Sequence, residues 1–104
     1  MIHPIVTEKI QAYKKQLVQA GIPVEKLIVF GSQIRGTARD DSDIDLCVLS
    51  SQFPENDFDV QVQLLLIRTH DTIEIEPHPM RPSDFSDQYN VLASEIQKYG
   101  VVVK

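Results

Sequence analysis

Two carboxylates and a Gly-Ser pair are the groups in this chain whose types and spacing could do chemistry. Asp43 and Asp45 lead into an apolar run, Ile44 to Leu49, and residues two apart on a strand project from the same face. Two neighbouring carboxylates repel each other, and burying either one unpaired is costly. A divalent cation shared by Asp43 and Asp45 removes that penalty, so the pair predicts a metal site.

A second feature lies upstream, where the apolar run Leu27 to Phe30 ends at Gly31-Ser32. Glycine permits close approach of the backbone, and Ser32 can begin a helix whose first amide groups are free to bind an anion. Alone, this pair is more often a plain strand-to-helix turn, but the acids downstream favour phosphate binding. Arg35 either contacts the phosphate or has a structural role, in which it holds the connector or pairs with an acid, and both interpretations stay open.

The spacing of these groups resembles a known signature. Gly31-Ser32, ten residues and then Asp43-Ile44-Asp45 is similar to the motif of the nucleotidyltransferase superfamily that includes DNA polymerase β. The form Gly-Ser-x-x-Arg-Gly suggests its minimal nucleotidyltransferase branch. The resemblance implies transfer of a nucleoside monophosphate, AMP from ATP in the first instance, to a hydroxyl group with the help of two Mg²⁺ ions.

The same resemblance implies roles for individual residues. Asp43 and Asp45 would hold both metal ions, and Gly31, Ser32 and Arg35 would bind the triphosphate. A third carboxylate is expected on a neighbouring strand. The stretch Ile75-Glu76-Pro77-His78-Pro79 resembles a sequence at this place in some small members, which favours Glu76 as catalytic residue and metal ligand.

The assignment of Glu76 as the third carboxylate has two alternatives. Glu74 shares the predicted face with Glu76, and both could instead line a solvent-facing strand edge. Many members of the superfamily carry Asp at this place, so the longer Glu puts full activity in doubt. His78 lies between two prolines and is interpreted as a loop residue rather than a catalyst.

The periodicity of apolar residues predicts an α/β (α+β) chain. Helices are expected at 6–20, with Thr7 as N-cap, at 57–68, and from Ser83 to a stop at Gly100, with an interruption near 88–90. Strands are expected at 27–30, 44–49, 72–76 and 101–103, with Pro77 and Pro79 ending the third. Together with the resemblance, this predicts a polymerase β-like fold: a mixed sheet of three or four strands, with helices mainly on one face, in a single domain over residues 1–104.

Composition narrows the class of partner. Fifteen acidic and ten basic side chains give a net charge of -5, which argues against duplex nucleic acid as a binding partner. A single cysteine, Cys47, excludes a disulfide framework. The sequence has no signal peptide pattern and no apolar segment of membrane-spanning length, so we expect a cytoplasmic protein without a membrane contact.

The resemblance also implies a partner protein. Stand-alone minimal nucleotidyltransferases often act beside a helical HEPN-type ribonuclease toxin, so the chain is expected to be an antitoxin that transfers AMP onto that toxin. Leu64, Leu65 and Leu66 need burial on more than one side, which suggests a homodimer or a hetero-oligomer. The alternative is a catalytically idle binding module that neutralises its partner by contact. Nucleotide preference and acceptor stay open.

Overall fold

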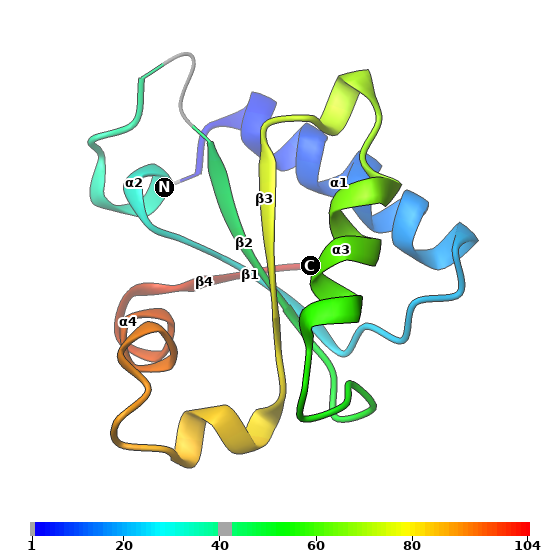
Figure 1. Ribbon diagram of the computed structural model, residues 1–104. Helices are drawn as coiled ribbons and strands as arrows, with labels where there is room; N and C mark the ends of the chain where they lie inside the picture. Colours follow the sequence, from blue (N-terminus) through cyan, green and yellow to red (C-terminus); the bar gives the residue numbers. More distant parts are fainter. Residues whose placement is uncertain (1, 40–42) are drawn as a thin grey trace.

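The computed structural model describes residues 2–39 and 43–104, and its centre is a four-stranded sheet in the order β3-β2-β1-β4 (Figure 1). The central strand β1 pairs antiparallel with β2 and with β4, whereas β3 runs parallel to β2. The strands are β1 (Lys26–Phe30), β2 (Ile44–Leu49), β3 (Ile75–Met80) and β4 (Val101–Val103). The predicted mixed sheet is confirmed.

The helices are α1 (Pro4–Gln19), α2 (Ser32–Arg35), α3 (Phe58–Ile67) and α4 (Val91–Tyr99), with 3₁₀ segments η1 (His70–Thr72) and η2 (Pro82–Ser86). The predicted N-cap of the first helix is wrong. His3 caps it instead, because its Nδ1 accepts from the Ile5 amide at 3.1 Å and Pro4 starts a helix well without a donor. No helix in the described ranges is long and apolar enough to cross a membrane.

Each face of the sheet carries its own apolar cluster. On one face, alternate residues of β1 and β2 pack against α1 and α3, with Ile10, Leu17 and Leu64 fully buried. The Tyr13 hydroxyl donates to the Leu64 carbonyl at 2.7 Å and ties α1 to α3. On the other face, a smaller cluster that includes Cys47 packs against α4. The longer helices therefore share one face, and part of the opposite face is left for the site.

Strand β3 corrects the prediction that Pro77 and Pro79 end the strand, since it runs through both of them. The Glu74 carbonyl accepts from the Ile44 amide of β2 and the Met80 carbonyl from the Ser50 amide directly after β2, so even-numbered residues direct their backbone groups toward β2. Odd-numbered residues face the open edge, where a missing N–H costs no ladder bond. The prolines are tolerated because β3 is an edge strand, and the local sequence cannot reveal that.

Helix α3 covers this open edge with two polar side chains. Arg68 donates to the outward carbonyls of Ile73 and Ile75 at 3.0 and 3.1 Å, and Gln61 donates to that of Pro77 at 2.8 Å. Three successive outward carbonyls are thus satisfied without a further strand. Together with the prolines, these bonds protect the edge against pairing with another chain.

Candidate functional site

The candidate site is built by the register of three strands. Phe30 on β1 is opposite Asp45 on β2, and Asp45 is opposite Glu76 on β3. Residues opposite each other in a sheet project from the same face. This face also carries Cys47 and Met80, which α4 covers. Asp45 and Glu76 lie on the part of the face beyond that cover, so they reach solvent.

His78 completes a group with the two acids. One ligand atom from each of Asp45, Glu76 and His78 lies within 4.8 Å of the others. His78 Nε2 is 3.3 Å from Asp45 Oδ1 and 4.0 Å from Glu76 Oε1. The side chains of Asp45 and His78 are 27% and 23% exposed, and that of Glu76 is 48% exposed. The group is therefore anchored in the sheet yet open to an ion.

Asp43 stands outside this group. It precedes the first residue of β2 and its side chain is exposed, while its backbone carbonyl accepts from Gln33 Nε2 at 3.5 Å. The side chains of a strand alternate between its two faces, but Asp43 lies before the strand begins, so this alternation does not place it on the face of Asp45. The structure thus brings Asp45 and Glu76 together and leaves Asp43 at the entrance of β2, and a metal-binding role for Asp43 stays a prediction.

Gly31 contacts Asp45 more closely than any other residue type could. Its φ of 77° lies in the region that favours glycine, and an added Cβ would overlap with Asp45 Oδ2. Ser32 follows directly and begins α2. The turn at Gly31 and Ser32 therefore places its backbone against the carboxylate of Asp45. The motif predicted that the turn and the acid lie close together.

Arg35 pairs with an acid in this structure. Its Nη1 lies 2.8 Å from Glu95 Oε1, which links α2 to α4. More than half of the Arg35 side chain is exposed. This contact is one of the two roles that the sequence left open, and phosphate binding stays a prediction.

The two candidate glutamates occupy different surroundings. Glu74 forms a 2.7 Å ion pair with Lys9 of α1, and the bond to Lys9 lowers the pKa of Glu74 below its usual value. Glu76 stands beside Asp45 and His78. The structure therefore offers Glu76 as the carboxylate that can act together with Asp45.

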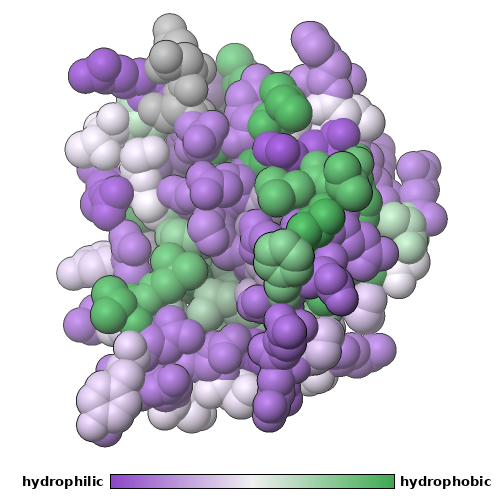
Figure 2. All heavy atoms as spheres, viewed as in Figure 1, coloured by the Kyte–Doolittle hydropathy of each residue, from purple (hydrophilic) through white to green (hydrophobic). Residues whose placement is uncertain are grey.

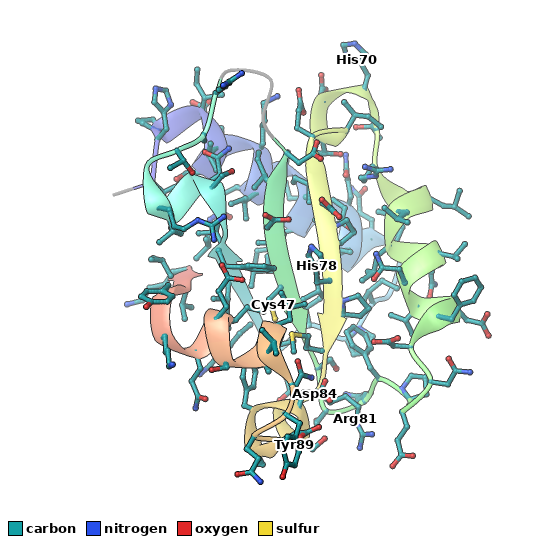
Figure 3. The ribbon with its side chains drawn as sticks, turned by 60° about the vertical axis from the view of Figure 1, so that its left-hand side comes forward. Cys47, His70, His78, Arg81, Asp84 and Tyr89 are labelled. Atoms are coloured by element: carbon teal, nitrogen blue, oxygen red, sulfur yellow. The ribbon has the colours of Figure 1, made fainter. Side chains whose placement is uncertain are left out.

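His78 is the residue that sequence reasoning missed, because it was expected in a loop after β3. It lies within β3, in Cα register with Cys47 of β2. Figure 3 shows it in the middle of the strand, whereas His70 is at the far tip near η1. The signal was available in the spacing, because His78 is two residues from Glu76 and shares its face once the strand is extended.

Comparisons with known proteins give one family model and two similar solved structures. The family model described as nucleotidyltransferase domain matches residues 8–99. A structure of a putative nucleotidyltransferase from Sulfolobus solfataricus superposes with a TM-score of 0.66 at 14% identity, covering 93% of this chain and 78% of that one. A toxin–antitoxin structure with AMP-PNP gives a TM-score of 0.62 at 22% identity, covering 94% and 72%. A search of curated proteins found no significant match. Because both identities are low, the two structures support the fold of this chain and nothing more specific.

Proposed function

Because this chain belongs to the nucleotidyltransferase domain family, we propose that it transfers AMP from ATP to a hydroxyl of a partner protein, with pyrophosphate as the leaving group. The observation that carries the proposal is the pair Asp45 and Glu76 beside the turn at Gly31. Carboxylates grouped next to a glycine turn suit a substrate that brings phosphates and divalent cations together. The residues present therefore fit the metal ions that the family implies.

The carboxylates are proposed to divide the work by position. Asp45 and Glu76 would hold one divalent cation between β2 and β3, and Asp43 would contribute to a second from the start of β2. When bound, the ions neutralise the charge that develops on the attacking and leaving oxygens. Glu76, the most exposed of the three grouped side chains, would accept the proton of the incoming hydroxyl.

The turn after β1 is proposed to hold the phosphates. The backbone amides of Gly31 and Ser32 would donate to the β- and γ-phosphates, and no side chain at Gly31 blocks their approach. Arg35 would reach the γ-phosphate by exchanging its bond with Glu95, since its guanidinium is exposed. Binding and orientation supply most of the catalysis of phosphoryl chemistry.

The partner is proposed to be a helical HEPN-type toxin, which makes this chain an antitoxin. The similarity to the toxin–antitoxin structure with AMP-PNP supports that context.

An exposed apolar row on α3, which we call the α3 stripe, offers a surface for the partner. It consists of Phe58, Val62 and Leu66, whose exposed fractions are 67%, 37% and 79%. These positions are four residues apart and form one ridge along the helix. Figure 2 shows hydrophobic side chains gathered over α3.

The charges around the α3 stripe favour a partner of opposite charge over a second copy of this chain. Asp57 and Asp59 lie at the start of α3, and Asp71 follows its end; all three are exposed. Arg68, in the same region, is engaged with backbone carbonyls. Two copies joined by their stripes would bring these acids together, whereas a partner helix with an apolar face and basic flanks would be attracted.

Transfer to the partner can be tested directly. The purified chain is incubated with ATP labelled on its α-phosphate, Mg²⁺ and the protein encoded beside it. We expect label on that protein. Label on a tRNA or a small molecule, with none on the neighbour, would overturn the protein acceptor.

A second candidate function is neutralisation of the partner by contact alone, which the α3 stripe favours because it needs no chemistry. Leu66→Ser should abolish partner binding in a titration by biolayer interferometry, while Val91→Ser, at a residue 81% exposed on α4, should not. Asp43→Asn separates the two functions. It should end neutralisation if transfer is required and leave it intact if contact suffices.

A further inference from the structure

His78 carries an inference about which cation the site prefers. It offers a ring nitrogen to a group whose other two members, Asp45 and Glu76, offer oxygen. In the proposed function the ion between β2 and β3 is held by the two carboxylates alone. The question is whether the imidazole belongs to the same ion site or only supports Asp45.

The distances suit a single ion. For metal–ligand bonds of about 2.1 Å, neighbouring ligand atoms lie about 3.0 Å apart and opposite ones about 4.2 Å apart. His78 Nε2 lies 3.3 Å from Asp45 Oδ1 and 4.0 Å from Glu76 Oε1, within that range. Small side-chain adjustments would therefore bring all three atoms onto one ion.

The His78 ring is held in place by its surroundings. Its centroid is 5.2 Å from that of Phe30, with the two rings inclined at 61° in an edge contact. Pro77 and Pro79 on either side have fixed φ angles, and the carbonyl of Pro77 is held by Gln61. A preorganised ligand loses little conformational entropy when it binds. The edge contact with Phe30 and the two neighbouring prolines therefore hold the ring in a fixed position, with 23% of the side chain exposed.

The donor set then determines the preference. Mg²⁺ takes oxygen ligands and accepts nitrogen poorly, whereas first-row transition ions accept imidazole readily. We propose that His78 is a third protein ligand of the site and makes it select Mn²⁺ over Mg²⁺. The proposal deepens the nucleotidyl-transfer function, because it concerns the same site, but it is stated as a property of binding.

Binding of Mn²⁺ to the full chain, without ATP or acceptor, tests the proposal. The loss of the electron paramagnetic resonance signal of free Mn²⁺ reports binding, and competition by Mg²⁺ gives the second affinity. His78→Gln should weaken Mn²⁺ binding at least about tenfold and Mg²⁺ binding much less. His70→Gln, at an exposed histidine outside the group, should change neither. Asp45→Asn should weaken both.

Two results would overturn the proposal. Unchanged Mn²⁺ affinity in His78→Gln would mean that the histidine only supports Asp45, a role that the glutamine amide can also fill. Equal losses of Mn²⁺ and Mg²⁺ affinity would mean that it sets no preference. A circular dichroism spectrum of each variant verifies the fold. Because nucleotide and acceptor are absent, a failure of AMP transfer would leave these binding results standing, and the reverse also holds.

Discussion

At the scale of single residues, Gly31 is the position where backbone and site meet. Gly31→Ala should lower the free energy of unfolding by about 2 kcal/mol, because alanine is strained at this backbone conformation and its Cβ overlaps with Asp45. Nucleotide binding should weaken with it, since Asp45 must move. Urea denaturation and an ATP titration measure the two effects.

Gly36 provides the matched control for this change. It has a φ of 74° but nothing within 4 Å of an added Cβ, so Gly36→Ala should cost only about 1 kcal/mol of backbone strain. Nucleotide affinity should stay at its original value. Equal effects of the two substitutions on ATP binding would contradict the proposed contact between Gly31 and Asp45.

Cys47 lies behind the site on the face covered by α4 and should be chemically silent. Burial raises the pKa of its thiol to about 12, so the reactive thiolate is scarce at neutral and mildly alkaline pH. The folded chain should react with Ellman's reagent far more slowly at pH 8 than the chain in urea. Stoichiometric labelling at equal rates in both conditions would show that the thiol is accessible.

The site residues differ in how far sequence could predict them. Asp45 and the turn at Gly31 were predicted from spacing, because strand alternation and a sequence motif act over a few residues. Glu76 was chosen over Glu74 from the resemblance of its surrounding sequence to small members of the family. His78 was missed because Pro77 and Pro79 were expected to end the strand. Its contact with Asp45 depends on the pairing of β3 with β2, which joins residues about thirty positions apart. Local patterns do not carry that register.

At the scale of elements, the sequence did not predict that β3 is an edge strand whose outward carbonyls accept hydrogen bonds from side chains of α3. Proline normally signals the end of a strand, but here both prolines face outward and α3 supplies donors to the free carbonyls. The helices and the other three strands follow from apolar periodicity, so those predictions were close. The edge could not be predicted, because it depends on which strand lies outermost.

Arg68 should therefore matter more than a surface arginine usually does. Arg68→Ala should reduce the free energy of unfolding by about 2 kcal/mol, since it removes charged hydrogen bonds to three backbone carbonyls. Urea denaturation gives the value, with Lys98→Ala at an exposed position of α4 as the control. Similar midpoints for the two variants would show that solvent satisfies the edge equally well.

At the scale of the whole molecule, two carboxylates, Glu25 before β1 and Glu74 before β3, should contribute to the response to acid. A hydrogen bond from the Ser51 amide lowers the pKa of Glu25, and the bond to Lys9 lowers that of Glu74. A carboxylate with a lowered folded-state pKa stabilises the fold above its ordinary pKa of 4.5. This contribution is lost as the pH falls through the folded-state value.

The contribution of Glu74 can be isolated by substitution. Glu74→Gln should reduce the loss of unfolding free energy between pH 5 and pH 3, measured by urea denaturation at each pH. Glu8→Gln, at an exposed position of α1, should retain the slope of the original chain. An unchanged slope in Glu74→Gln would contradict a stabilising ion pair with Lys9.

The central claim is that a cation and a triphosphate bind side by side between β2, β3 and the turn after β1. A crystal structure with a non-hydrolysable ATP analogue and Mn²⁺, examined by anomalous diffraction, measures this most directly. We predict an anomalous peak among Asp45, Glu76 and His78, with the phosphates against Gly31 and Ser32. Ions and phosphates bound elsewhere, with this face of the sheet empty, would contradict the account.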